Sequence, residues 1–186
     1  TALYTSTMMP DPNAQWSLDN VALGTVDSTG LFKAFGNVGG VATIEAVDPG
    51  ANAKGSTTVT VSVLLTENPG NISMSDQTKL KAGGNGDAQF RWLYPYNKTV
   101  FPRGLTPATM QFDGQAANAT MVHMSSKFLD YTGFFAGSNP TRVQLSIAMW
   151  KNVLNSVGGA DPLTVEVTKL TGGIAQINVG GAKRPG

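Results

Sequence analysis

The stretch of sequence that decides the fold is Thr57-Thr58-Val59-Thr60-Val61-Ser62-Val63-Leu64, in which valine alternates with threonine or serine. This period of two places every second side chain on one face of a strand, so we expect one face to pack in a core. Residues 41–47 show a similar pattern, and they lie between Gly39-Gly40 and Asp48-Pro49-Gly50, which are typical of turns. We predict that the two runs form a hairpin with a loop around residues 52–55.

The composition also favours strands over exposed helices. Charged residues make up 13% of the chain, which is about half the usual share, whereas glycine occurs 22 times. Exposed helices normally carry pairs of glutamate and lysine, and such pairs suit this composition poorly. The apolar fraction of 41% is enough for a packed core. No run approaches the roughly 20 apolar residues of a membrane helix, so we expect no membrane span.

Charge and cysteine content exclude several classes of function. The net charge of +1 gives no field that would attract nucleic acid, so we expect no partner of that class. The absence of cysteine excludes disulfides, thiolate metal sites and cysteine nucleophiles. No signal peptide is visible, and we interpret a chain that starts at Thr1 as mature or trimmed, with its export signal upstream. An arbitrary boundary explains this start equally well.

Turn-rich sequence around Glu67-Asn68-Pro69-Gly70-Asn71 and at residues 79–87 divides the chain into two predicted domains. We place the first domain at residues 1–66, a linker at 67–87 and the second domain at 88–186. Trp16 is the expected core anchor of the first domain, because burying an indole contributes strongly to a small core. In the second domain we expect strands at residues 90–94, 109–112, 120–125, 163–170 and 174–179.

One segment of the second domain has a helical pattern instead. Apolar residues recur there at helical spacing, at Ile147, Trp150, Leu154 and Val157. Ser146 is suited to cap the start of this helix, and Gly158-Gly159 is suited to end it. We therefore predict one short helix, packed on the edge of a sandwich.

Four blocks occur in order in the first half: a Trp-Ser strand at residues 16–20, a hairpin at 24–34 that turns at Asp27-Ser28-Thr29-Gly30, a glycine turn and strand at 39–46, and a closing strand at 57–63. With these blocks, residues 1–64 resemble the group-2 bacterial immunoglobulin-like domain. That family has a further strand before the one expected at residues 2–7. The resemblance therefore implies an unpaired sheet edge, which an upstream piece of the precursor or a neighbouring subunit would fill by strand addition.

Three blocks of the second half, at residues 90–96, 99–105 and 120–126, are similar to a fibronectin type III-like module of bacterial surface proteins and lipoproteins. The similarity covers roughly residues 88–180, and it implies scaffolding rather than chemistry. The expected fold class is therefore all-β, with two tandem immunoglobulin-like and fibronectin III-like β-sandwiches and one short helix in the second.

Aromatic residues of the second domain are the candidate ligand or interface residues: Trp92, Tyr94, Tyr96 and Phe101. Exposed rings would stack on sugars, whereas buried rings would simply form core, which is the interpretation we favour. Because Tyr94 and Tyr96 are expected on the same strand face as Trp92, part of this row is also a candidate interface.

His123 is the only histidine of the chain. Alternation along its strand predicts that Val122 and Met124 face the core and that His123 faces the other way. Ser125 lies two residues further along the strand, which by itself gives no hydrogen-bond geometry for a nucleophile and base pair. We therefore predict no catalytic residue and no enzymatic activity.

We predict no metal site and no cofactor. A zinc site needs several histidine, cysteine or carboxylate ligands, and this chain has one histidine and no cysteine. Asp11 with Asn13 and Asp19 with Asn20 are the nearest approaches to a calcium cluster. We interpret both pairs as turn residues that bond to their own backbone.

The sequence thus predicts a non-catalytic extracellular or cell-surface bacterial protein with a structural or adhesive role, such as a stalk or filament subunit assembled by strand complementation. Its expected partners are further copies of itself or other surface proteins, with glycans as another candidate. The alternative function is a carbohydrate- or receptor-binding module of a larger secreted protein. A hydrolase that uses His123 is the least favoured hypothesis.

Overall fold

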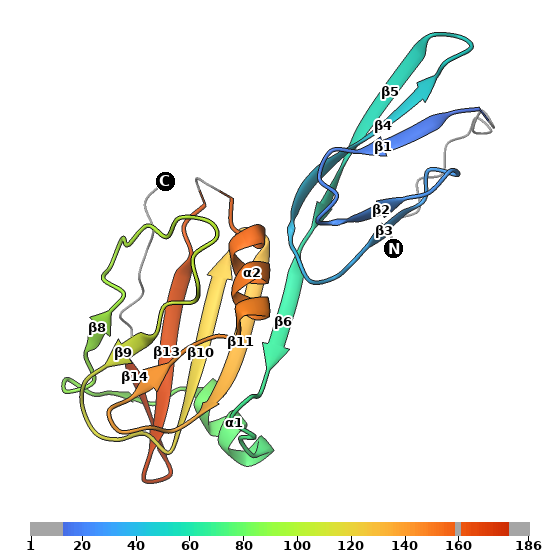
Figure 1. Ribbon diagram of the computed structural model, residues 1–186. Helices are drawn as coiled ribbons and strands as arrows, with labels where there is room; N and C mark the ends of the chain where they lie inside the picture. The colour runs from blue at the N-terminus through green and yellow to red at the C-terminus, as the bar shows by residue number, and fades with distance from the viewer. Residues whose placement is uncertain (1–12, 159–160, 179–186) are drawn as a thin grey trace. The chain divides into compact units, whose positions relative to one another are not determined.

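The computed structural model describes residues 13–158 and 161–178 of the chain (Figure 1). Over these residues the protein is mostly β-strand, arranged in four sheets, with two α-helices. The predicted all-β character is confirmed at this level. The chain divides into two compact units, Thr1–Val63 and Leu64–Gly186, which are described separately below.

The first unit contains a three-stranded and a two-stranded sheet. The larger sheet has the order β1 (Gln15–Leu18), β4 (Gly40–Asp48), β5 (Ala53–Val61), and the smaller one pairs β2 (Gly24–Val26) with β3 (Phe32–Ala34). Strands β4 and β5 are antiparallel from the pair Gly40 and Val61 to the pair Asp48 and Ala53. The predicted hairpin is therefore confirmed, but its turn lies at residues 49–52, and residues 53–55, which were expected in the loop, belong to β5.

A small apolar core lies within this first unit. Its buried members come from both sheets and the loops between them, namely Leu23, Phe32, Val38, Ala42, Ile44 and Val59. Trp16 packs against this cluster but stays partly exposed, so it is an anchor at the edge of the core rather than its centre. Gly30, with φ of 82°, lies so close to Trp16 that an added Cβ would stand 2.7 Å from the indole ring.

The predicted turn at residues 27–30 is confirmed as the link between β2 and β3. The Oδ1 atom of Asp27 accepts bonds from the Thr29 amide at 2.8 Å, the Thr29 hydroxyl at 2.6 Å and the Leu31 amide at 3.1 Å. The Gly30 amide donates to the Asp27 carbonyl at 3.0 Å. One carboxylate thus satisfies several donors of a tight turn, which is why aspartate is favoured there.

The second unit is built on a six-stranded sheet. Its order is β6 (Val63–Glu67), β11 (Leu129–Ala136), β10 (Ala119–Ser126), β13 (Thr164–Thr171), β14 (Ile174–Asn178) and β7 (Asn85–Gly86). The central pairings of β10 with β11 and β13 are antiparallel, whereas β14 pairs with β7 in parallel. A smaller sheet has the order β12 (Arg142–Val143), β9 (Met110–Phe112), β8 (Trp92–Tyr94).

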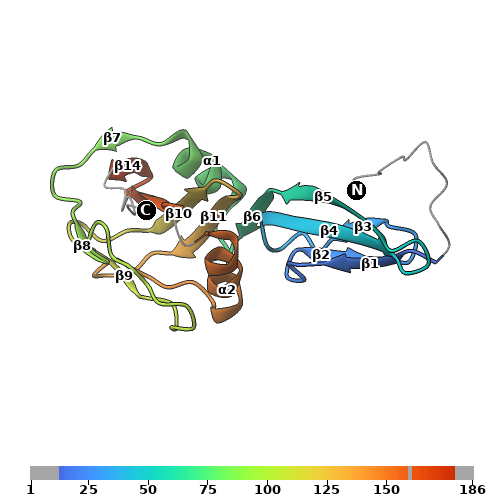
Figure 2. The same ribbon diagram turned by 90° about the horizontal axis from the view of Figure 1, so that it is seen from above.

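Two helices lie on opposite sides of this main sheet, as Figure 2 shows for the region of β10 and β11. Helix α1 (Met74–Ala82) packs Leu80 into a buried cluster with Phe134 and Leu170. Helix α2 (Ile147–Ser156) buries Trp150, Val153 and Ser156 against the other side. The sheet is thus covered on both faces, although α1 covers its face only in part.

The predicted helix is confirmed as α2, and its details differ in two respects. Ser146 caps its start by accepting a bond from the Met149 amide at 3.1 Å, as expected. However, Ile147 is 58% exposed, so the buried stripe begins at Trp150 instead. The helix ends at Ser156, and its C-cap is Val157 rather than the glycine that follows.

Residues 67–87, which the sequence suggested as a linker, contain the end of β6, all of α1 and strand β7. Ser73 caps α1 by accepting a bond from the Asp76 amide at 3.2 Å, and Lys79 pairs with Asp76 at 2.8 Å. This second helix was missed because Leu80 is its one buried residue. A single apolar contact gives no helical stripe in the sequence.

Candidate binding pocket

Strand β10 separates two different environments, because its side chains alternate between the faces of the main sheet. Val122 and Met124 are buried on the face that α2 covers. The His123 side chain is 30% exposed on the opposite face. The predicted orientation of these three residues is therefore confirmed.

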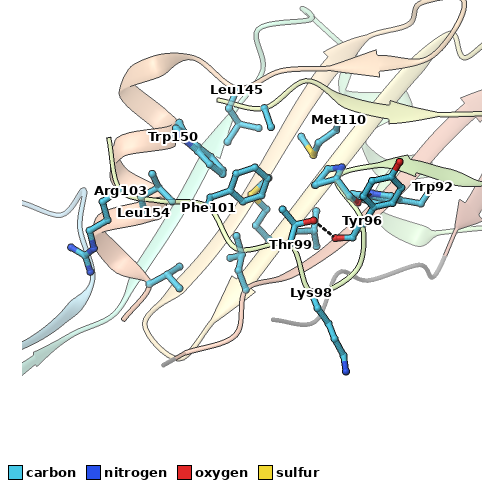
Figure 3. A pocket seen from close by; sticks show the side chains of 16 residues that line it. Trp92, Tyr96, Lys98, Thr99, Phe101, Arg103, Met110, Leu145, Trp150 and Leu154 are labelled. Atoms are coloured by element: carbon cyan, nitrogen blue, oxygen red, sulfur yellow. Dashed lines mark hydrogen bonds between the residues drawn. The ribbon is translucent and has the colours of Figure 1, made fainter. Parts of the chain in front are cut away.

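A cavity of about 110 Å³ lies on the Met124 side of the sheet (Figure 3). Its floor includes Met124 and Val165, which are directly paired between β10 and β13. We call it the aromatic cavity, lined by Trp92, Pro95, Tyr96, Lys98, Thr99, Phe101, Arg103, Ala108, Met110, Met124, Leu145, Trp150, Leu154, Val157, Leu163 and Val165. Most of these residues are apolar, as in typical small-molecule sites.

The roof of the aromatic cavity is a loop of 15 residues, 95–109, between β8 and β9. A loop of this length without regular structure is uncommon in a compact domain and is usually functional. Two residues within it have positive φ, Lys98 at 68° and Gly104 at 92°, and they mark its sharp reversals. The loop thus supplies seven of the lining residues from one continuous segment.

Hydrogen bonds to fixed side chains hold this loop in place. The indole N–H of Trp150 donates to the Leu105 carbonyl at 3.1 Å, and the Gln144 amide donates to the Pro107 carbonyl at 2.8 Å. The indole N–H of Trp92 donates to the Pro95 carbonyl. These bonds fasten the loop near both of its ends to side chains outside it, so the cavity is preformed.

The four candidate residues lie at different depths around this cavity. Phe101 packs edge-on against Trp150 with ring centroids 5.6 Å apart, and Trp92 packs edge-on against Phe112 at 4.7 Å. Tyr96 lines the cavity but is 72% exposed. Tyr94 is not a lining residue; its ring lies edge-on to Tyr96 at 6.1 Å.

The expectation that Tyr94 and Tyr96 share one strand face with Trp92 is wrong. Strand β8 ends at Tyr94, so Tyr96 lies beyond it in the loop. Within β8, Trp92 pairs with Phe112 and Tyr94 pairs with the adjacent Gln111, which marks an irregularity of register. A bulge of this kind changes the alternation of side chains, so residues two apart no longer share a face.

Further lining residues were not singled out by sequence reasoning. Trp150 and Leu154 were recognised only as a helix stripe, and Met124 only as core. Their common signal was hydrophobicity, which does not distinguish a cavity wall from a filled core. The long segment between β8 and β9 was the feature that could have indicated a site.

The charged residues that line the aromatic cavity, Lys98 and Arg103, are both basic. Both are exposed, and neither forms an ion pair within the part of the chain that the structure describes. Figure 3 shows both side chains extending outward from the ring of aromatic residues. Among residues 13–158 and 161–178, no aspartate or glutamate lines the cavity, so the two basic side chains give its rim a positive charge.

His123 lies in a separate and more open cleft beside α1. Its Nε2 atom is 3.1 Å from Asp130 Oδ1, and its Nδ1 atom is 3.5 Å from Glu166 Oε2. The same cleft is lined by Lys81 and by threonines of β11 and β13. Over the described residues, both nitrogens of the imidazole lie beside carboxylates, and no hydrogen bond joins the ring to Ser125.

Asn20 bonds to the backbone of its own turn, as the sequence interpretation expected, whereas Asp19 bonds to the backbone of β4, 24 residues away. Asp19 Oδ1 accepts from the Thr43 amide at 2.7 Å, and this bond lowers the pKa of Asp19 below its usual value. Asn20 Oδ1 accepts from the Ala22 amide at 3.3 Å. Asp11, and the strand expected at residues 2–7, lie outside the described residues.

Comparison with known proteins gives no family: no family model, curated protein or solved structure matches this chain. Over residues 13–158 and 161–178, neither helix has the length and apolar character that a membrane crossing requires. In the same residues, no three histidine or acidic side chains gather in a way that could hold a metal ion. The function must therefore be inferred from the aromatic cavity itself.

Proposed function

We propose that this chain is a non-catalytic, extracellular adhesion protein of the bacterial surface, formed by two tandem immunoglobulin-like and fibronectin III-like sandwiches, whose second unit binds its partner in the aromatic cavity. The observation that supports this proposal is the convergence of Trp92, Tyr96 and Phe101 on one preformed apolar cavity. Rings that line a cavity give a binding site its affinity, because they bury a large area with few rotatable bonds.

The position of the histidine favours binding over catalysis. His123 lies on the opposite face of the main sheet from the aromatic cavity. A general base must lie within hydrogen-bond reach of its substrate, and histidine is the side chain most often used for this purpose. The chain has one histidine, so a ligand in the cavity would be held without an imidazole beside it.

The fixed roof of the cavity also favours a binding role. A loop that must become ordered on binding costs affinity, whereas a loop already held in place does not. The bonds from Trp150 to Leu105 and from Gln144 to Pro107 anchor the roof without a ligand. The aromatic cavity therefore resembles a preorganised site rather than a gap left by imperfect packing.

Adhesion is tested with beads coated with the purified protein. We expect the beads to be retained on bacterial envelope, mucin or cellulose surfaces more strongly than albumin-coated beads. Tyr96→Ala should reduce retention several-fold, because Tyr96 is mostly exposed and its loss should leave the fold intact. Phe35→Ala is the matched control, since Phe35 is an exposed aromatic residue of the first unit. Retention that equals that of albumin on every surface would refute an adhesive role.

A structural role through self-association is favoured by a separate observation in the first unit. Strand β5 lies at the edge of the order β1-β4-β5, and within the described residues β4 is its one partner. Its residues from Ala53 to Thr57 are all exposed. A long exposed edge is a template for pairing with another chain.

Sedimentation and electron microscopy test this assembly. Subunits that complete one another's sheets should form oligomers at high concentration, and Ser56→Lys should dissociate them, because charges on an edge strand oppose pairing. A protein that stays monomeric up to millimolar concentration would exclude this mode of assembly.

Carbohydrate binding is favoured by the exposed face of Tyr96, beside Tyr94. Rings of this kind stack on sugars, and a glycan array tests the idea directly. Reproducible binding that Tyr96→Ala abolishes would support it, and the absence of any bound glycan would count against it.

A further inference from the structure

The size of the aromatic cavity limits what it can hold. Its volume of about 110 Å³ is somewhat below that of an apolar cavity of about 150 Å³ that binds benzene. One small ring or a short alkyl chain therefore fits, whereas a long acyl chain does not. An oligosaccharide is excluded from the interior for the same reason, so any sugar would lie against the outside.

The walls of the cavity determine the chemistry of the part that enters. Phe101, Trp150 and Leu154 from the roof and α2 face Met124 and Val165 from the sheet. The side-chain N–H of Trp150 is already bonded to the Leu105 carbonyl, and that of Trp92 to the Pro95 carbonyl. Both indole donors are thus engaged, so the cavity favours an apolar group.

The rim determines the chemistry of the part that stays outside. Lys98 and Arg103 stand on the roof loop on either side of Phe101, and both side chains are exposed. Among the described residues, no aspartate or glutamate lines the cavity with them. Cations of this kind attract an anionic head group, and arginine in particular matches the geometry of a carboxylate.

We propose that the aromatic cavity binds a small amphiphilic anion, in which a single ring or a chain of about four to six carbons enters the cavity and a carboxylate pairs with Lys98 or Arg103 at the rim. This inference rests on the proposed binding role of the cavity and names its ligand class. The acid can be a free molecule or the carboxyl-terminal aromatic residue of a partner chain, because both present the same two groups.

The three tryptophans of the chain allow ligand binding in the aromatic cavity to be measured directly. Trp92 and Trp150 line the aromatic cavity, whereas Trp16 belongs to the first unit. In protein labelled with 5-fluorotryptophan, a ligand in the cavity should shift the fluorine NMR signals of Trp92 and Trp150. The Trp16 signal should stay constant and serve as an internal control.

The ligands used are phenylacetate and the series butyrate, pentanoate and hexanoate, each compared with its neutral amide. Each added methylene should raise the affinity about fourfold until the cavity is filled, as expected for burial of apolar area. The carboxylates should bind up to about fivefold more tightly than their amides for each ion pair formed at the exposed rim. Acetylated Gly-Gly-Phe, with a free or an amidated carboxyl end, distinguishes a partner chain from a free acid.

Two variants separate the contributions of rim and cavity. Lys98→Glu with Arg103→Glu should abolish the preference for the carboxylate and leave binding of the amides unchanged. Lys127→Glu is the matched control, because it reverses a charge of the same unit that does not line the cavity. Ala108→Leu should weaken every ligand, since Ala108 lines the cavity and a larger side chain would fill it.

The outcomes separate this inference from the binding role itself. Carboxylate preference that Lys98→Glu with Arg103→Glu removes supports the proposal. If the ligands shift the fluorine signals of Trp92 and Trp150 but acids and amides bind with equal affinity, the anion inference is overturned and the cavity remains a binding site. If no ligand of the panel shifts either signal at 10 mM, both this inference and a ligand-binding role for the cavity are overturned.

Discussion

At Gly133, in the middle of strand β11, one added methyl group would strike a buried side chain. A Cβ atom there would lie 2.0 Å from the hydroxyl oxygen of Tyr131 and 2.7 Å from the Phe135 ring. Tyr131 is completely buried, and its hydroxyl donates a bond to Glu67 Oε1 at 2.7 Å across the pairing of β11 with β6. Burial, with the Glu67 carboxylate as a second cause, raises the pKa of Tyr131 far above its usual value, so this hydroxyl stays a donor.

The cost of Gly133→Ala follows from these contacts. The Tyr131 hydroxyl has to move by more than an ångström to reach an ordinary contact distance, and overpacking of this kind costs about 1–3 kcal/mol. The displaced hydroxyl also loses its bond to a carboxylate, which contributes about 1.5–3 kcal/mol. Alanine also leaves the unfolded chain fewer conformations than glycine does, and this effect offsets about 0.4–1 kcal/mol of the destabilisation. We expect the free energy of unfolding of the second unit to fall by about 2–5 kcal/mol.

Urea titration followed by fluorine NMR of labelled tryptophan measures this change unit by unit. Trp92 and Trp150 report on the second unit, and Trp16 reports on the first, whose midpoint should not change. Gly86→Ala is the matched control, because an added Cβ at Gly86 has no atom within 4 Å. Its effect should stay within about 0.5 kcal/mol.

A double variant tests the mechanism. Tyr131→Phe removes the oxygen that the new methyl group would strike, so Gly133→Ala should cost about 1–3 kcal/mol less in that background. An equal cost in both backgrounds would refute the proposed clash with the hydroxyl. A Gly133→Ala protein as stable as Gly86→Ala would refute the whole explanation of this glycine.

Three further predictions concern the two helices and the first unit. Leu80→Ala should destabilise the second unit by about 2–5 kcal/mol, because Leu80 is the completely buried residue of α1. Urea titration measures this loss of stability, and the rate of hydrogen exchange should rise first in that helix. Ser146→Ala should cost about 1 kcal/mol by urea titration, because it removes the N-cap bond of α2. The first unit should lose stability as the pH falls below 3.8, because bonds from Thr43 and Thr29 lower the folded-state pKa values of Asp19 and Asp27. Below that pH the unfolded chain binds more protons than the folded one, which favours unfolding. The fluorine signal of Trp16, followed in urea between pH 6 and pH 2, measures this loss.

Each of these predictions has a control or a contrary result. Met74→Ala, at an exposed position of α1, should leave hydrogen exchange in that helix unchanged, and an effect equal to that of Leu80→Ala would contradict the role of burial. Ile147→Ala should cost less than Ser146→Ala, because Ile147 is mostly exposed. A flat dependence of the first unit on pH between 4 and 2 would show that the bonds to Asp19 and Asp27 do not stabilise it.

Local patterns in the sequence were sufficient for features that depend on near neighbours. The hairpin of β4 and β5 followed from alternation and turn residues, and the turn at residues 27–30 followed from its Asp and Gly. The orientation of His123 away from the core followed from the period of the strand alone. Each of these depends on residues a few positions apart, whose geometry the backbone imposes directly.

Strand β11 shows where local patterns fail. It is a central strand of the main sheet, yet Gly133 and Asp130 interrupt its sequence and it was not predicted. Gly133 is required there because the Tyr131 ring lies over it to reach Glu67, 64 residues away in the chain. A glycine that serves a distant contact looks like a turn signal when only its neighbours are considered.

The aromatic cavity likewise depends on contacts between residues that are distant in the sequence. The sequence supplied Trp92, Tyr96 and Phe101 as aromatic residues, and Trp150 and Leu154 as one side of a helix. Only the packing of the 95–109 loop over the main sheet brings them around one space, with Lys98 and Arg103 at its rim. Hydrophobicity determines that such side chains leave water, but the distant contacts of the fold determine whether they fill a core or surround a cavity.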